Sequence, residues 1–420
     1  MSAFGCGDAD ARLAAADENR VILVNLRTFI GGLRAHPGFP GLLGTTLALG
    51  IAHSFVVPYL AIWATEQIGF SSSAFGVFMT VAALCAVVVG TTVARWSDVA
   101  VSRRTVLTLG ALGGVCGYLG YAFVKEPVVL VGIAMTVIAL STICFPQLFA
   151  HVRERFDGLR TDAARGGLLM SIVRVCFSVA WTAGPAVGAV VVQYFGFRGL
   201  FISAALLYVI FLFGVRRFVP QTPPKAEPAA KVPVWRVLMR GDILAAFVAF
   251  LVVFAAHAIN MINLPLMITR ELGGSARDLG FVFGVGPVVE IPLMIWFGHL
   301  AGRGYQRRLM IVGAAATVLY FALLGFVAHT WQVMLLQMLS GVSFAILTNI
   351  AILFFQDLLP GQTGLGTAVF ANAGNTGNLA GYLLFGLLIE PFQHRGLYIV
   401  CTALGTITLI VISWLRPRAT

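Results

Sequence analysis

The chain has 420 residues, of which 59% are hydrophobic and 11% are charged, and its formal net charge is +11. Because a soluble domain carries about 25% charged residues, this chain has too little charge to cover a surface in water and too much apolar surface for one core. The composition excludes a secreted disulfide scaffold, a coiled coil and a disordered chain, and it predicts an all-α polytopic membrane protein. A channel, a membrane-embedded enzyme and a transporter remain open as function classes.

The chain opens with a charged segment, residues 1–40, that contains one apolar stretch too short to cross a bilayer. We expect an extension here rather than a signal peptide, because no small-residue cleavage site follows the apolar stretch. Apolar segments of about 20 residues, the length that a bilayer requires, then occupy residues 41–61, 74–94, 105–124, 128–150, 166–193 and 198–218.

A segment rich in proline and charge, residues 219–242, interrupts the apolar pattern. Proline ends helices and charge is costly in lipid, so this segment is predicted to be a linker. Further apolar segments occupy residues 243–266, 277–297, 309–327, 332–355, 365–389 and 396–415. The sequence therefore predicts two six-helix halves, 41–218 and 243–415, followed by a short tail, 416–420.

The positive charge is distributed unevenly between the two sides of the predicted bundle. Of the 28 lysine and arginine residues, 22 lie in the N-terminal extension, the linker, the tail and the loops after spans 2, 4, 8 and 10, whereas five lie in the opposite loops. Since lysine and arginine are retained on the cytoplasmic side, we expect both termini and the linker in the cytoplasm and the bundle in the cell (inner) membrane. The net charge therefore indicates topology and requires no nucleic-acid partner.

The loops after spans 2 and 8 indicate an internal repeat. They end in the arginine pairs Arg103–Arg104 and Arg307–Arg308, which are 204 residues apart, close to half the chain. Together with Asp98, the first pair resembles the signature of the major facilitator superfamily between helices 2 and 3. The resemblance implies the twelve-helix major facilitator fold. It also implies a gating role for Asp98, because the family's aspartate is thought to lock the cytoplasmic ends of the halves through a helix N-terminus. The alternative is a solvated turn that follows the positive-inside rule.

Four further segments are similar to the sugar efflux transporters, the branch of that superfamily that exports lactose, glucose and alkyl or aryl glycosides. They are residues 145–154, 171–185, 290–294 and 355–362. The resemblance runs from about residue 42 to residue 412. Residues 184–188 also resemble the helix 5 signature of exporters in the superfamily, which favours export over uptake.

Arg174 and Glu290 lie well inside predicted spans 5 and 8. Ionisable groups in lipid are costly and are candidates for function. Both residues lie about 12 Å from the cytoplasmic ends of their spans, and helices 5 and 8 face each other in the major facilitator arrangement. We hypothesise that the two side chains meet when the cytoplasmic side closes, and that Glu290 binds and releases a proton to couple export to proton entry. A structural bridge without coupling and two unrelated positions are the alternatives.

Polar residues that recur at helical spacing supply the substrate-binding candidates. Ser171, Arg174, Ser178 and Trp181 follow one stripe of span 5, where hydroxyls and an aromatic face suit a sugar. Amides, which donate and accept hydrogen bonds, suit neutral polyols. The other candidates are His53 in span 1, Gln147 in span 4, His257, Asn260 and Asn263 in span 7, Gln337 and Asn349 in span 10, and Asn372 and Asn375 in span 11. Helix packing and interhelical hydrogen bonding are the alternative roles for these side chains.

No catalytic motif of the HExxH, GxSxG or Walker A type occurs, so the sequence predicts no enzyme, catalytic residue, metal or cofactor. A duplicated chain with a linker and paired loop motifs favours a secondary transporter over a channel. We expect a monomeric exporter of sugars or glycosides that works by proton antiport and alternating access. Export of a drug or natural product on the same scaffold is the first alternative, and a transporter-like sensor is the second.

Overall fold

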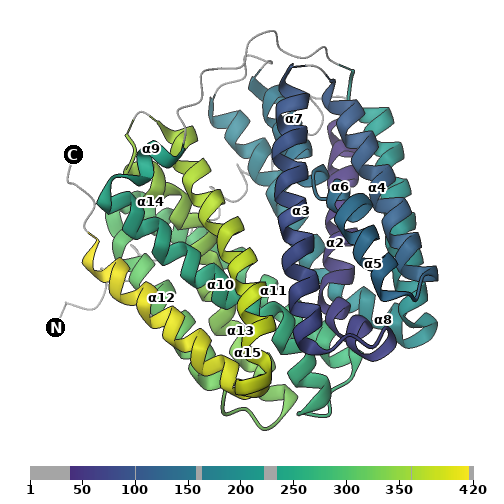
Figure 1. The fold of residues 1–420 in the computed structure, drawn as a ribbon. Helices are drawn as coiled ribbons and strands as arrows, with labels where there is room; N and C mark the ends of the chain where they lie inside the picture. The colour runs from purple at the N-terminus through teal and green to yellow at the C-terminus, as the bar shows by residue number, and fades with distance from the viewer. Residues whose placement is uncertain (1–37, 100, 158–162, 222–233, 361, 416–420) are drawn as a thin grey trace, which may run out of the picture.

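The computed structural model describes residues 38–99, 101–157, 163–221, 234–360 and 362–415, and within these ranges all regular structure is helical. Figure 1 shows the helices in two bundles that follow each other along the chain. The first contains α2 (Phe39–Ile62), η1 (Trp63–Gln67), α3 (Ser72–Val99), α4 (Arg103–Phe123), α5 (Pro127–Ile133), η2 (Ala134–Ile138), α6 (Ala139–Ser141), α7 (Cys144–Asp157) and α8 (Ala163–Phe218), where η marks a π-helical segment. After the short α9 (Val234–Leu238), the second contains α10 (Gly241–Arg270), α11 (Ala276–Leu300), η3 (Ala301–Tyr305), α12 (Gln306–Leu324), α13 (Thr330–Phe344), η4 (Ala345–Ile350), α14 (Ala351–Asp357) and α15 (Thr363–Trp414).

The helical conformation follows from the apolar composition of the segments. Lipid offers no hydrogen-bond partners, so a spanning segment must pair its backbone groups internally, as a helix does. In the described part of the chain, nine helices are long and apolar enough to cross a membrane. Threonine hydroxyls within them donate to the carbonyl one turn earlier, as Thr45 does to Gly41 O at 2.7 Å, so these polar groups also find a partner inside the helix.

Three of these helices are much longer than one crossing requires. They are Val175–Phe218 in α8, with 44 residues, and Gly364–Trp414 in α15, with 51. The third is the continuous run of α11, η3 and α12, Ala276–Leu324, with 49 residues. Each contains one residue with a positive φ where the sequence predicts a loop between two spans: Gly196 at 64°, Gly304 at 87° and Gln393 at 57°. Since about 20 residues cross a bilayer, each long helix divides there into two crossings. The count of twelve spans stays a prediction, which this division supports.

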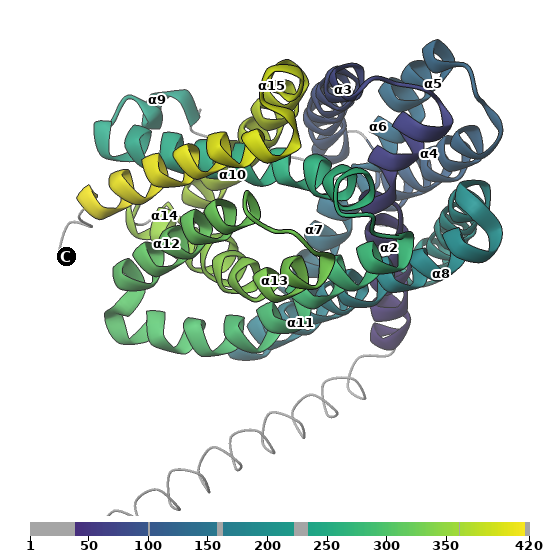
Figure 2. The ribbon, with the colours of Figure 1, turned by 90° about the horizontal axis from the view of Figure 1, so that it is seen from below.

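The two bundles touch at one end and diverge toward the other (Figure 1), and Figure 2 shows them from the touching end. They diverge toward the end where α8 stops at Phe218 and α9 begins, which is the end of the predicted linker. At the touching end α3 crosses α15 with glycine on both sides. A Cβ on Gly76 would lie 2.5 Å from the nitrogen of Gly386, so this crossing has no room for a side chain. Beside it, the Ser73 hydroxyl donates to Glu390 Oε1 at 2.8 Å.

A second contact between the bundles joins α2 and α8 to α11. Gly280 of α11 approaches α8 so closely that a Cβ there would lie 2.8 Å from the Cβ of Ala189 and 3.0 Å from the carbonyl oxygen of Pro185. The hydroxyl of Tyr59 in α2 donates to the same carbonyl at 2.6 Å and lies 3.4 Å from the carbonyl oxygen of Ala276. Both contacts lie at the touching end of the molecule.

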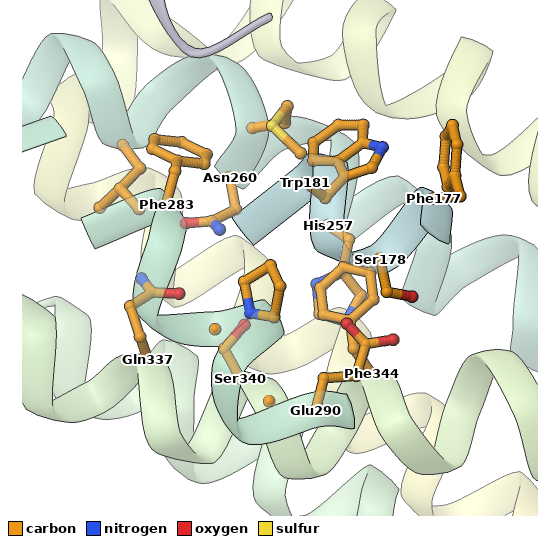
Figure 3. Close-up of a pocket in the computed structure, with 15 residues that line it drawn as sticks. Phe177, Ser178, Trp181, His257, Asn260, Phe283, Glu290, Gln337, Ser340 and Phe344 are labelled. Carbon is orange, nitrogen blue, oxygen red and sulfur yellow. The ribbon is translucent and has the colours of Figure 1, made fainter. Parts of the chain in front are cut away.

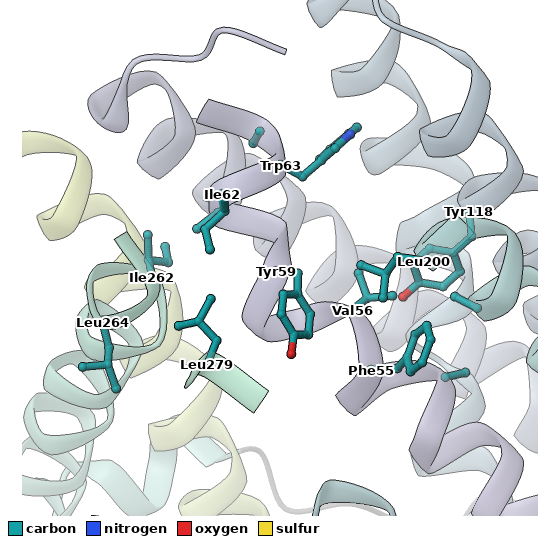
Figure 4. Packing of buried hydrophobic residues seen from close by; sticks show 14 of the residues in the cluster. Phe55, Val56, Tyr59, Ile62, Trp63, Tyr118, Leu200, Ile262, Leu264 and Leu279 are labelled. Atoms are coloured by element: carbon teal, nitrogen blue, oxygen red, sulfur yellow. The ribbon is translucent and has the colours of Figure 1, made fainter. Parts of the chain in front are cut away.

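Buried apolar side chains continue the core from one bundle into the other at this end. Figure 4 shows Tyr59 and Ile62 of α2 beside Ile262 of α10 and Leu279 of α11. All four belong to one buried cluster and are at most 5% exposed. The touching end is therefore packed like a protein interior.

Candidate functional site

A cavity of about 280 Å³ lies between the two bundles (Figure 3). Its wall from the first bundle is α8, and its walls from the second bundle are α10, α11 and α13. The residues that line it are Phe177, Ser178, Trp181, His257, Asn260, Met261, Leu264, Phe283, Gly286, Pro287, Glu290, Gln337, Ser340, Gly341 and Phe344.

The cavity brings together residues that the sequence singles out in four different spans. They are Ser178, Trp181, His257, Asn260, Glu290 and Gln337. In Figure 3 the amides of Asn260 and Gln337 lie on one side and Trp181 and Ser178 on the other. The arrangement offers hydrogen-bond donors and acceptors opposite an aromatic surface, which a ligand with both hydroxyls and an apolar face can use.

Two tyrosines behind the cavity hold its amides in place. Tyr320 of α12 accepts from Asn260 Nδ2 at 3.3 Å and from Gln337 Nε2 at 3.1 Å. Tyr398 of α15 donates to Asn260 Oδ1 at 3.2 Å. All four side chains are buried, and a buried polar network of this kind fixes the orientation of its members. The tyrosines are therefore positioning residues for the amides that face the cavity.

His257 lines the cavity and has one polar atom without a hydrogen-bond partner among the described residues. The side chain is 8% exposed, and its ring packs against Phe344 at 4.5 Å between centroids and against Phe321 at 5.3 Å. Its Nδ1 has no hydrogen-bond partner among the described residues. Because this nitrogen is itself buried, leaving it unpaired is costly in this arrangement.

His53 does not line the cavity, but its ring contacts Trp181, which does. Its side chain is exposed, and its ring meets the Trp181 ring edge-on at 5.8 Å between centroids. The Phe177 ring also lies beside the tryptophan, at 6.4 Å between centroids. Trp181 is thus supported by aromatic contacts from α2 and from its own helix.

Glu290 lines the cavity from α11 and is partly buried. Its carboxylate has no hydrogen-bond or ion-pair partner among the side chains that the structure describes. The side chains of Arg174, Ser171 and Asp98 lie outside the described part of the chain, so the pairing of Arg174 with Glu290 and the gating role of Asp98 stay predictions.

The structure places Asn263 and Asn349 away from the cavity. Asn263 is fully buried, donates to the carbonyl oxygen of His394 at 2.8 Å and shares a second hydrogen bond of 2.8 Å with Nδ1 of the same histidine. It joins α10 to α15. Asn349 donates to the Ala345 carbonyl at 3.3 Å, inside its own helix.

The remaining amides lie in other parts of the molecule. Gln147 is buried at the start of α7, where Oε1 accepts from Arg103 Nη1 at 2.6 Å. Asn372 and Asn375 are exposed on α15, more than two helical turns from the contact at Gly386 and toward the end where the bundles diverge. They do not line the cavity in this arrangement.

Comparison with known proteins identifies the fold family. A sequence model of the Major Facilitator Superfamily matches residues 42–303 and 246–420. The chain belongs to this superfamily. It is a multi-pass membrane protein and not an enzyme, as the sequence predicts.

Several relatives cover most of the chain. It is 29% identical to a putative sugar efflux transporter of Deinococcus radiodurans over 389 residues, which cover 90% of this chain and 99% of the relative. It is 27% identical to sugar efflux transporter A of Escherichia coli, with 86% of this chain and 92% of the relative covered. A multidrug resistance protein of Proteus mirabilis is 25% identical over 56% of this chain and 60% of its own length.

A crystal structure of the nucleoside transporter NupG has the same fold. It superposes with a TM-score of 0.74 over 90% of this chain and 99% of the transporter, at 13% sequence identity. This likeness confirms the predicted fold class.

Proposed function

We propose that the chain exports sugars or glycosides through the cavity between its bundles. The observation that carries this proposal is the presence of an aromatic ring, Trp181, and two oriented amides, Asn260 and Gln337, around one cavity. A pyranose ring has an apolar face that stacks on an aromatic ring and hydroxyls that donate and accept hydrogen bonds. The similarity to proteins named sugar efflux transporters supports this substrate class.

We further propose that the bundles work by alternating access. In the described arrangement they pack together at the end away from the linker, through the glycine crossing of Gly76 with Gly386 and the contact of Gly280 with α8. The uneven charge distribution favours a cytoplasmic linker and cytoplasmic termini, and we propose the cell (inner) membrane as the location. The cavity of this arrangement would then open to the cytoplasm, from which an exporter takes its substrate.

Proton antiport is the proposed energy source, with Glu290 as the proton carrier. The carboxylate shares its cavity with the proposed sugar-binding groups. A carboxylate that exchanges aqueous for apolar surroundings as the bundles move can change its protonation state. Protonation of Glu290 and binding of the sugar would therefore compete with each other in one arrangement of the bundles.

Counterflow in proteoliposomes tests the substrate class. Labelled glucose, lactose and an aryl glycoside are offered outside vesicles loaded with the same unlabelled compound. Saturable exchange of at least one is expected, and an absence of exchange for all three would overturn the proposal.

Export of an aromatic drug or natural product is the second candidate. Phenylalanines from three helices, Phe177, Phe283 and Phe344, line the cavity, and a relative over part of the chain is named a multidrug resistance protein. Under this alternative, an apolar aromatic cation exchanges in the same vesicles and all three sugars fail.

A further inference from the structure

A second hollow lies on the outside of the molecule, between α8 and α11 at the touching end. Its volume is about 450 Å³. We call it the α8–α11 groove; its lining residues are Ala186, Ala189, Val190, Gln193, Tyr194, Arg277 and Phe281. The groove begins where Gly280 approaches Ala189, so its two sides come from different bundles.

The floor of the groove is apolar and faces lipid. Val190 is 53% exposed and Phe281 is 48% exposed, and both lie on helices that are apolar enough to span a membrane. On a membrane helix, apolar side chains with this exposure contact acyl chains. The floor is therefore suited to one acyl chain lying between the bundles.

The mouth of the groove is polar and basic. Gln193 and Tyr194 lie near the end of the first half of α8, before the break at Gly196, and Arg277 is the second residue of α11. These positions are at the ends of spans, where lipid headgroups begin, and the 72% exposure of Tyr194 fits the aromatic belt found at that depth.

Arg277 has no acidic partner among the residues that the structure describes. Its guanidinium lies 5.6 Å from the centroid of the Phe281 ring, and it forms no salt bridge with the described carboxylates. The neighbouring Asp278 is engaged in the helix cap, where it accepts from the backbone nitrogen of Ser275 at 2.8 Å. None of the groove residues is acidic, so the groove has a positive charge for a phosphate and no negative charge for an ammonium group.

We propose that the α8–α11 groove binds an anionic phospholipid, with the headgroup phosphate on Arg277 and one acyl chain over Val190 and Phe281. Arginine matches phosphate geometry with paired donors. Because the lipid would contact both bundles where they touch, its binding would favour the arrangement described here. This site is separate from the cavity and does not depend on the identity of the exported substrate.

Native mass spectrometry of the purified full chain tests the proposal. Phosphatidylglycerol and phosphatidylethanolamine with identical acyl chains are titrated into detergent micelles. We expect tighter binding of phosphatidylglycerol, and Arg277→Gln should weaken it about tenfold, the factor of one charge-assisted hydrogen bond. Arg198→Gln is the matched control, because Arg198 is also near the end of a span and also lies over a ring, that of Phe123 at 4.4 Å, outside the groove.

Two further variants separate loss of the site from loss of the fold. Arg277→Lys keeps the charge but loses the paired donors, so it should bind phosphatidylglycerol more weakly than the wild type while still preferring it to phosphatidylethanolamine. Val190→Trp fills the groove and should weaken binding of this lipid while Arg277 is intact. The proposal is overturned if Arg277→Gln binds phosphatidylglycerol like the wild type, if both lipids bind equally well to the wild type, or if Val190→Trp leaves binding unchanged.

Discussion

Replacing Gly76 by alanine should push the two bundles apart at the end where they now touch. The added Cβ would lie 2.5 Å from the backbone nitrogen of Gly386, and a backbone atom of a packed helix cannot rotate away as a side chain can. Gly386→Ala should be milder, because its Cβ would lie 3.1 Å from the Ser73 carbonyl oxygen, its nearest neighbour. The two substitutions are therefore expected to differ in effect although both add one methyl group.

Overpacking of this kind costs about 1–3 kcal/mol. The cost applies to the arrangement with touching ends and disappears when those ends separate. The population of the arrangement with separated ends, relative to the arrangement with touching ends, should thus rise roughly 5- to 150-fold. Gly90→Ala is the control on the same helix, because nothing lies within 4 Å of the Cβ that it adds.

Spin labels on residues 67 and 392, both exposed at the touching end, report the separation through the distribution of distances between them. The native cysteines are replaced by serine in this experiment. Gly76→Ala should add or enlarge a population at longer distance, and Gly90→Ala should not. An unchanged distribution for Gly76→Ala would show that this crossing does not hold the bundles together.

Glu290→Gln should abolish export driven by an imposed pH gradient while counterflow persists, and Glu126→Gln, an exposed loop carboxylate, should retain both. Full gradient-driven export by Glu290→Gln would end the proton-carrier proposal. Tyr320→Phe removes the acceptor shared by the two cavity amides and should raise the KM of counterflow on the order of tenfold; an unchanged KM would contradict its positioning role. Asn263→Ala leaves His394 without two hydrogen bonds and should lower stability by about 1–3 kcal/mol. A melting temperature equal to that of the wild type in detergent would contradict this role.

The sequence alone predicts the fold class and part of the cavity, for reasons that particular residues make clear. A polar side chain in an apolar span needs a partner or a wet surface, so Glu290, Asn260 and Gln337 stand out. The same rule does not distinguish a polar side chain that faces a cavity from one that bonds to another helix. Asn260 faces the cavity, whereas Asn263, one turn further along α10, joins two helices through His394.

Apart from Trp181, the aromatic side chains of the cavity could not be predicted in this way. An apolar residue in a membrane helix is equally at home against lipid, in the core or beside a cavity. Phe283 and Phe344 therefore carry no sequence signal of their position, and Tyr320 lies in a span that has no other mark of function. These assignments require the packing of α10, α11, α12 and α13 in three dimensions.

The central claim is that a sugar binds between the bundles against Trp181. It is tested most directly by saturable counterflow of an aryl glycoside into proteoliposomes that contain the wild type, Trp181→Ala or Trp414→Ala, an exposed tryptophan at the end of α15. Loss of the stacking surface should raise KM about tenfold or abolish exchange in Trp181→Ala, while Trp414→Ala exchanges like the wild type. Equal exchange by all three proteins would contradict the claim.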